Sequence, residues 1–241
     1  MQSRLNPPRA LVFGGTGTLG AEVLKGLARA NIPTAFTWHQ SRERAHALAS
    51  ELSMRPMQVD LSDAVATRGA LRALREEGFA PNLFIHCAGL NASASLDKIT
   101  DELWQKTMAV NCQSAFIACQ ELAPTMAQAG EGHIVLVGAL DRTQSAPSPV
   151  HFAASQGALS AMAMAVSKEL GPKGVRINVV ALGLLEGGLS REVGEKLVAD
   201  YKGFSALRRL GRPEEAAKAI LWLALENTYM NGKVMPVNGG I

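Results

Sequence analysis

The chain has 241 residues, which is enough for one sizeable hydrophobic core and too few for two large domains. Apolar residues make up 47% and charged residues 19%, a balance typical of a globular chain and not of a disordered one. The net charge of +3 is too small to indicate nucleic acid or a membrane surface as a partner. No stretch approaches the roughly 18 uninterrupted apolar residues of a spanning helix.

Residues 1–9 and the cysteines indicate the cellular compartment of the protein. Residues 1–9 lack the apolar core of a signal peptide. Cys87, Cys112 and Cys119 are odd in number and form no C-x-x-C pair. We therefore expect reduced thiols, with neither a metal site nor a disulfide framework, in a cytoplasmic protein.

Seven short apolar runs alternate along the chain with longer helical stretches. The runs lie at residues 10–13, 34–38, 57–59, 83–85, 134–137, 175–181 and 234–237. Strands that are apolar on both faces are typical of a parallel sheet, and helices between them supply the crossovers. The pattern predicts one α/β domain over residues 1–241, a Rossmann-type doubly wound parallel sheet of about seven strands.

The segment from 184 to 207 is the least regular part of the chain and follows the sixth run. It holds four glycines: Gly187, Gly188, Gly194 and Gly203. Ligands of open α/β sheets bind beyond the carboxyl ends of the strands, so this segment is a candidate substrate lid.

The first apolar run ends in a glycine-rich turn that opens a helix. The turn reads Gly14-Gly15-Thr16-Gly17-Thr18-Leu19-Gly20 and fits G-x-G-x-x-G at 15, 17 and 20 or G-x-x-G-x-x-G at 14, 17 and 20. Such glycines let the backbone approach a pyrophosphate at a helix N-terminus. The alternative is a tight turn with no ligand.

The end of the second run indicates which dinucleotide would bind. It carries no Asp or Glu for the ribose 2′-hydroxyl of NAD, whereas Arg42 and Arg44 could pair with a 2′-phosphate. This favours NADP(H). The alternative is that both arginines are solvated residues of a helix face. Trp38 is either a stacking partner for adenine or a core aromatic.

Further segments carry a family resemblance. They are Val59-Asp60-Leu61-Ser62-Asp63, Cys87-Ala88-Gly89, Val110-Asn111, Gly132-His133-Ile134-Val135, Val175-Arg176-Ile177-Asn178, Leu182-Gly183, Leu210-Gly211-Arg212-Pro213-Glu214-Glu215 and Val237-Asn238-Gly239-Gly240. Together they resemble the short-chain dehydrogenase/reductase family, nearest to its 3-oxoacyl-[acyl-carrier-protein] reductases, over roughly residues 9–241. The cofactor-binding set implied by the turn and the resemblance is Gly14, Gly15, Thr16, Gly17, Leu19, Gly20, Arg42, Asp60, Leu61, Cys87, Ala88, Gly89 and Gly183.

The catalytic residues of that family do not carry over. The resemblance places Ala139 at the family's catalytic Ser, Phe152 at its Tyr and Gln156 at its Lys, and only the active-site Asn is retained, as Asn111. Reduction of a carbonyl needs a proton donor as well as a hydride donor. Phenylalanine has no proton to give, alanine offers no hydrogen bond, and glutamine carries no charge that would lower a neighbour's pKa.

Other residues depart from the family pattern or offer substitutes. Thr18 and Gly187 differ at the glycine turn and after the Leu182-Gly183 pair, which weakens the expected nicotinamide end. His151 is a conceivable proton donor, with an exposed helix-start histidine as the alternative. His86 either contacts the ligand or is packed in the core. Asp141 and Arg142, which follow Ala139, either border the pocket or are loop charges.

Two main functions follow. The first is a catalytically degenerate relative of the reductases that keeps the fold, with NADP(H) binding either retained or lost, and works as a structural or regulatory subunit. The second is an NADP-dependent oxidoreductase or acyl-chain-modifying enzyme with non-standard residues. A dinucleotide sensor is a third. The Ala-, Ser-, Gly- and Met-rich segment 153–166 and the resemblance predict a homodimer or homotetramer, with an active paralogue or an acyl-carrier protein as further partners.

Overall fold

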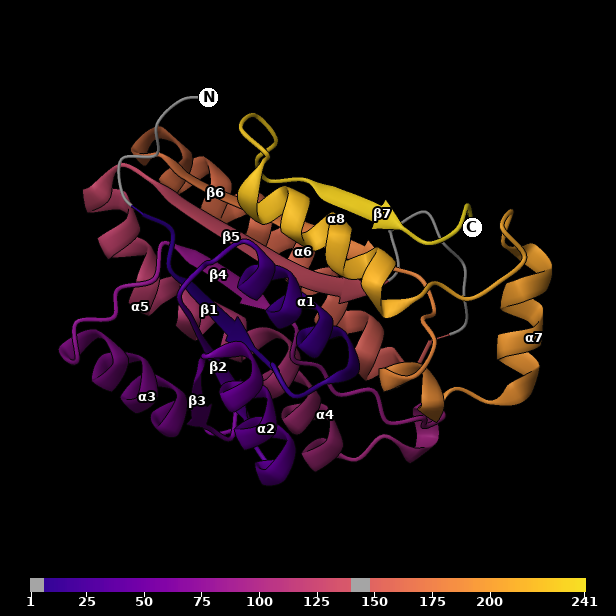
Figure 1. Cartoon of the computed structure of the whole chain (residues 1–241). Coiled ribbons are helices and arrows are strands. Elements are labelled where there is room, and N and C mark those ends of the chain that lie inside the picture. The colour runs from indigo at the N-terminus through magenta and orange to yellow at the C-terminus, as the bar shows by residue number, and fades with distance from the viewer. Residues whose placement is uncertain (1–6, 140–147) are drawn as a thin grey trace.

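A seven-stranded parallel sheet forms the centre of this computed structural model, which describes residues 7–139 and 148–241 (Figure 1). Asp141 and Arg142 lie outside the described residues. The strand order is β3-β2-β1-β4-β5-β6-β7. The strands are β1 (Ala10–Phe13), β2 (Thr34–Trp38), β3 (Arg55–Gln58), β4 (Leu83–His86), β5 (Gly132–Ala139), β6 (Val175–Leu182) and β7 (Val234–Val237). The predicted doubly wound α/β fold is confirmed.

Helices cover both faces of the sheet. The α-helices are α1 (Thr18–Arg29), α2 (Arg42–Leu52), α3 (Ala64–Glu76), α4 (Asp101–Met108), α5 (Ser114–Ala129), α6 (Val150–Leu170), α7 (Glu195–Phe204) and α8 (Pro213–Leu225). Shorter turns are the 3₁₀ segments η1 (Leu96–Lys98), η3 (Gly171–Lys173) and η4 (Gly188–Glu192) and a π-helical turn, η2 (Ala109–Gln113). Helices α1, α2 and α8 pack on one face, and α3, α5 and α6 on the other.

The alternation of side chains along each strand divides the core in two. In β1, Val12 points into the cluster under α1 and α8, whereas Leu11 and Phe13 point into the cluster under α3 and α5. All three side chains are fully buried or nearly so. Successive strand residues point to opposite faces, so a strand covered on both sides must be apolar throughout. For this reason the apolar runs in the sequence predict the strands of the sheet.

The strand boundaries differ from the predicted ones most in β5, which is two residues longer at each end, and in β3, which is displaced. The sequence predicts residues 57–59, but β3 pairs with β2 from Arg55 to Gln58, and Val59 follows it. β3 is the outermost strand on its side of the sheet, and its residues are only partly buried. An edge strand needs less apolar character, so its sequence signal is weaker.

The predicted lid is more regular than its glycines suggest, because residues 184–207 contain η4 and α7. In Figure 1, α7 stands beside the sheet, past the ends of β6 and β7. Within residues 7–139 and 148–241, no helix is both long and apolar enough to cross a bilayer.

Candidate functional site

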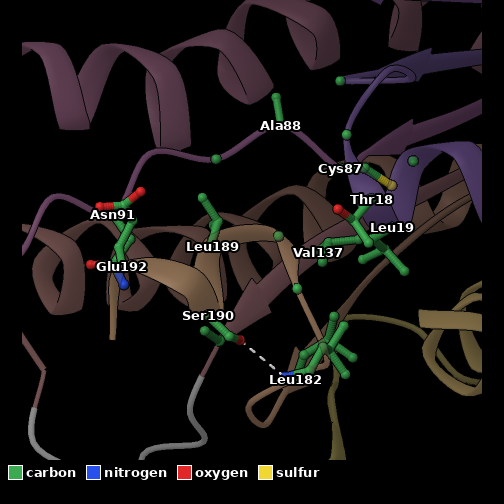
Figure 2. Close-up of a pocket in the computed structure, with 18 of the residues that line it drawn as sticks. Thr18, Leu19, Cys87, Ala88, Asn91, Val137, Leu182, Leu189, Ser190 and Glu192 are labelled. Atoms are coloured by element: carbon green, nitrogen blue, oxygen red, sulfur yellow. Dashed lines mark hydrogen bonds between the residues drawn. The ribbon is translucent and has the colours of Figure 1, made fainter. Parts of the chain in front are cut away.

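A cavity of about 620 Å³ opens at the carboxyl ends of the strands, where the strand order reverses between β1 and β4. That crevice is where open α/β sheets bind ligands, and pockets of roughly 300–1,000 Å³ suit cofactors and drug-sized molecules. Figure 2 shows Thr18 and Cys87 at one end of the cavity and Asn91 and Glu192 at the other. The predicted cofactor residues that line it are Gly14, Thr16, Gly17, Leu19, Gly20, Asp60, Leu61, Cys87, Ala88, Gly89 and Gly183.

The glycine turn is built by close backbone approach. Gly14 adopts a φ of +76°, and a Cβ on Gly20 would lie 2.2 Å from the Gly14 carbonyl oxygen. Gly17 begins α1 without a side-chain cap, so no side chain occupies the N–H groups of the first turn. Such a helix N-terminus favours an anion. Gly15 does not line the cavity; its absent Cβ makes room for the Phe36 ring.

The end of β2 forms a polar part of the cavity wall. His39, Ser41 and Arg44 line it, and Arg42 does not, so the arginine that the structure places at the cavity is Arg44. Asp60 lies across from His39, with 3.7 Å between Oδ2 and Nε2. Hydrogen bonds from the Ser62 side chain are the largest cause holding the pKa of the Asp60 carboxyl below its usual value.

Trp38, at the end of β2, is a core aromatic, and its stacking on adenine stays a prediction. It is only 7% exposed and belongs to the core cluster under α1, yet it also lines the cavity.

The Asn111 side chain connects the segment after β4 to helix α6 by hydrogen bonds. Asn111 lies in η2, the π-helical turn between α4 and α5. Its Oδ1 accepts a hydrogen bond from the Leu90 N–H at 2.7 Å, and its Nδ2 donates to the Leu90 carbonyl at 3.0 Å and to Ser155 Oγ at 2.9 Å. Asn111 is buried and does not line the cavity. Its amide therefore positions the segment after β4 against α6.

Ala139, Phe152 and Gln156 meet on one part of the cavity wall. Gln156 Oε1 accepts a hydrogen bond from the Ala139 N–H at 3.0 Å, and its Nε2 donates to Ser155 Oγ at 3.2 Å. Phe152 and Gln156 are four residues apart in α6 and thus share a helix face. Neither Ala139 nor Phe152 has a group that can donate a proton or a hydrogen bond from its side chain.

The two histidines considered as proton donors lie off the cavity wall. His86 is fully buried, with Nε2 2.7 Å from Ser114 Oγ, and burial lowers its pKa to about 4. Of the two predicted alternatives, contact with the ligand or packing in the core, the structure shows packing in the core. His151 is also fully buried, so the expectation of an exposed helix-start histidine was wrong. Its neighbour Val150, the first residue of α6, is 46% exposed, so the helix start turns one side chain to solvent and the next into the protein.

Cys87 lines the cavity as a neutral thiol. Burial raises its pKa to about 12, which suppresses the thiolate that a nucleophile needs. Cys87, Cys112 and Cys119 are all free cysteines. Within residues 7–139 and 148–241, no three His, Cys, Asp or Glu side chains gather in a way that could hold a metal ion.

The segment predicted as a lid lies beside the cavity, near the glycine turn and the end of β4. A Cβ on Gly188 would lie 3.5 Å from Thr18, and one on Gly89 would lie 3.1 Å from Leu189. A parallel bridge pairs Leu185 with Gly211 and fixes the near end of the lid. Most of the segment 184–194 contributes to the cavity wall, and its role as a lid stays a prediction.

Tyr201 attaches the lid helix α7 to the sheet. Its hydroxyl donates to the Asn238 carbonyl at 2.7 Å, just past β7, and the ring lines the cavity. Burial raises the pKa of the Tyr201 phenol.

Three residues in or beside the cavity were not predicted from the sequence: Asn91, Ser155 and Tyr201. Asn91 had a usable signal, since it is a polar residue just past the carboxyl end of β4, where ligands bind. Ser155 and Tyr201 had none, because their roles come from partners distant in the sequence.

Comparisons with known proteins show the family to which the chain belongs. A family model described as Enoyl-(Acyl carrier protein) reductase matches residues 16–241. The chain belongs to this family of short-chain dehydrogenases/reductases. It is 27% identical to the 3-oxoacyl-[acyl-carrier-protein] reductase MabA of Mycobacterium tuberculosis, over 96% of this chain and 91% of that protein. It is 27% identical to the reductase FabG of Chlamydia trachomatis, with 96% of each chain covered.

Solved structures are similar over almost the whole chain. A short-chain dehydrogenase/reductase of Serratia marcescens superimposes with a TM-score of 0.89, at 26% identity and 98% coverage of both chains. A blue fluorescent protein from a metagenomic library, solved in complex with NADPH, gives a TM-score of 0.90 at 26% identity and 99% coverage of both chains.

Proposed function

We propose that the chain binds NADP(H) in this cavity and does not carry out the standard carbonyl reduction of its reductase relatives. The dinucleotide, when bound, supplies or accepts a hydride. The residues fit it. The uncapped N-terminus of α1 with Gly17 would hold the pyrophosphate, Asp60 and Leu61 the adenine, and Arg44 a 2′-phosphate. A structural neighbour at 26% identity was solved with NADPH, which supports the assignment.

The part of the wall formed by Ala139, Phe152 and Gln156 carries the second half of the proposal. A hydride delivered to a carbonyl leaves an alkoxide that needs a proton, and these three side chains hold no acidic group. Loss of a general acid typically costs about 10²–10⁴ in rate. Gln156 spans from α6 to the Ala139 backbone and so serves as a structural bridge. We therefore infer a degenerate reductase that works as a structural or regulatory subunit.

The proposed partners follow from this role. We propose a homodimer or homotetramer, with an active paralogue or an acyl-carrier protein as the further partner of a regulatory subunit. The relatives named as 3-oxoacyl-[acyl-carrier-protein] reductases support the carrier protein as a candidate.

A calorimetric titration with NADPH and then NADH tests the cofactor half. NADPH should bind more tightly than NADH, and Arg44→Gln should narrow the difference by about tenfold, since a charge-assisted hydrogen bond to phosphate is lost. The matched control is Arg42→Gln, because Arg42 lies outside the cavity wall. Absence of binding by either dinucleotide would reject the cofactor assignment.

Turnover tests the catalytic half. The protein with NADPH and acetoacetyl-CoA should show no oxidation of NADPH at 340 nm. The combined variant Ala139→Ser, Phe152→Tyr and Gln156→Lys restores the three side-chain types of the family, and detectable turnover is its expected result. Substantial turnover by the unmodified chain would reject degeneracy and favour an NADP-dependent oxidoreductase with non-standard residues.

A further inference from the structure

His39 follows β2 in the cavity wall, and its imidazole is accessible to a ligand there. The side chain is 51% exposed and lines the cavity together with Arg44. The His39 backbone is held in place, because Gln58 Nε2 of β3 donates a hydrogen bond to the His39 carbonyl at 3.2 Å. The ring is therefore presented to the cavity from a fixed backbone, which is what a recognition group requires.

Asp60 is the acidic group that faces His39. Its Oδ1 accepts hydrogen bonds from the Ser62 N–H at 2.9 Å and from Ser62 Oγ at 2.6 Å, whereas its Oδ2 lies 3.7 Å from His39 Nε2. The distance of 3.7 Å is longer than a hydrogen bond, so this ring nitrogen is not committed to the carboxylate and remains available to a ligand.

The carboxyl group of Asp60 stays ionised over the pH range in which an imidazole titrates. The hydrogen bond from the Ser62 side chain is the largest cause that holds the pKa of Asp60 below its usual value, and the charges of His39 and Lys106 contribute less. The negative charge beside His39 is therefore constant, and the imidazole is the group whose charge changes near neutral pH.

The charged and titratable groups next to His39 come from three segments. They are Asp60 after β3, Lys106 on α4, and Arg42, Glu43, Arg44 and His46 on α2. Of these six, Asp60 and Arg44 line the cavity together with His39.

The protonation of His39 decides the balance of charge at this end of the cavity. While the ring is neutral, the positive charge of Arg44 and the negative charge of Asp60 offset each other. Once the ring is protonated, positive charge is in excess. A 2′-phosphate carries a charge of about −1.5 to −2 and gains from this excess, whereas the 2′-hydroxyl of NAD(H) carries no charge and does not.

We propose that His39 is a specificity-determining residue for the cofactor, which pairs in its protonated form with the 2′-phosphate of NADP(H). This inference rests on the proposed function, because it concerns the dinucleotide assigned to the cavity. The preference for NADPH over NADH should therefore grow as the pH falls and the ring takes up a proton. At higher pH the preference depends on Arg44 alone.

Calorimetric titrations of the full chain with NADPH and with NADH at two pH values test the proposal. The ratio of the NADH Kd to the NADPH Kd should rise at least about threefold between about pH 8 and about pH 6.5, as one partly exposed ion pair provides. The lower pH lies above the pKa of about 6 of a phosphate monoester, so the ligand keeps most of its charge.

Variants assign this pH dependence to the imidazole. His39→Gln should lose the rise and keep the lower preference at both pH values, because glutamine does not titrate. His39→Arg should keep the higher preference at both, because its charge is permanent. His46→Gln is the matched control: His46 is exposed on α2 and lies outside the cavity wall, so the rise should remain. Thermal melts of each variant confirm that the fold is intact.

The possible failures separate this proposal from the cofactor assignment. NADPH binding with no pH-dependent preference in the unmodified chain would overturn the role of His39 and leave the cofactor assignment standing. The same holds for an equal rise in the unmodified chain and in His39→Gln, or for a rise of that size in His39→Arg. Absence of binding by either dinucleotide at both pH values would overturn both proposals.

Discussion

At Gly20 a methyl group would collide with the backbone of its own turn, since the added Cβ would lie 2.2 Å from the Gly14 carbonyl oxygen. We predict that Gly20→Ala lowers the free energy of unfolding by about 1–3 kcal/mol, because the turn must shift to make room. It should weaken NADPH binding as well. Urea denaturation and calorimetry measure the two effects.

Gly69→Ala is the matched control for this prediction. Gly69 lies within α3, and a Cβ there would meet nothing within 4 Å. The same added methyl should leave stability unchanged or raise it by up to about 1 kcal/mol, because alanine is the better helix former. Equal destabilisation by both changes would contradict the collision argument.

His86 predicts a specific pH dependence of stability. Its pKa in the folded protein is about 4, below the ordinary value of 6.5, because burial disfavours the charged ring. Between these two values the unfolded chain binds more protons than the folded one, so stability falls as the pH drops from about 6.5 toward 4. The loss should approach about 3 kcal/mol.

Urea denaturation at a series of pH values checks this. His86→Gln keeps a hydrogen-bonding side chain near Ser114 and should flatten the slope in that window. His46→Gln, at an exposed position of α2, should leave the slope as it is. A slope unchanged in His86→Gln would show that another group causes the acid sensitivity.

What the sequence reveals at this scale depends on whether a residue acts through its own chemistry or through a partner. Phe152 lacks a proton wherever it lies, so the missing acid was predictable from the residue type. The bond from Asn111 to Ser155 spans 44 positions and exists only after α6 packs against η2. The periodicity and spacing of residues therefore could not predict this contact.

At the scale of elements, the Tyr201 phenol is the bond from within α7 to the segment after β7, beside the bonds that Ser205, Ala206 and Leu207 make there at the end of the helix. We predict that Tyr201→Phe loosens the lid, because the Asn238 carbonyl then loses its donor, a change of about 0.5–1.5 kcal/mol. Hydrogen exchange of residues 195–204 should be faster, with the sheet unaffected. The control is Tyr229→Phe, whose side chain is 97% exposed. Equal exchange in both variants would mean that the phenol does not hold the lid.

Burial explains part of which elements were predictable, since the edge strand β7 lies at its predicted residues although its side chains are only partly buried. β1, β2 and β7 lie at the predicted residues, whereas the edge strand β3 is displaced and α7 was not foreseen. α7 buries few of its residues, so its sequence lacks a strong apolar stripe. The helix α7 of the predicted lid was therefore hard to predict from the sequence, because it buries few apolar side chains in the core.

At the scale of the molecule, the fold was predictable because every strand of a buried parallel sheet repeats one simple pattern. Its assembly is a further prediction. Trp104, Phe116 and Met164 are 40–48% exposed on α4, α5 and α6, and α6 contacts both of the other helices. Apolar side chains grouped on adjoining helices favour association with a second copy.

Sedimentation velocity should show a dimer or a tetramer. Phe116→Glu and Met164→Glu should each shift the protein toward smaller species, because a charge would be buried in the contact. Val65→Glu is the control: Val65 is 81% exposed on α3, outside this group of helices. A monomer in the unmodified protein would reject the assembly.

The π-helical turn has a consequence for insertions and deletions. From Asp101 to Ala129 the chain is one helix interrupted by η2, whose wider turn holds a residue more than a regular one. Removing one residue there would let the helix become continuous with α4 and α5 still in phase, but the residues inside the turn would shift relative to their neighbours. The Asn111 amide could then no longer meet both Leu90 and Ser155. A single missing codon in this short stretch would therefore do more damage than the loss of several residues from an outer loop.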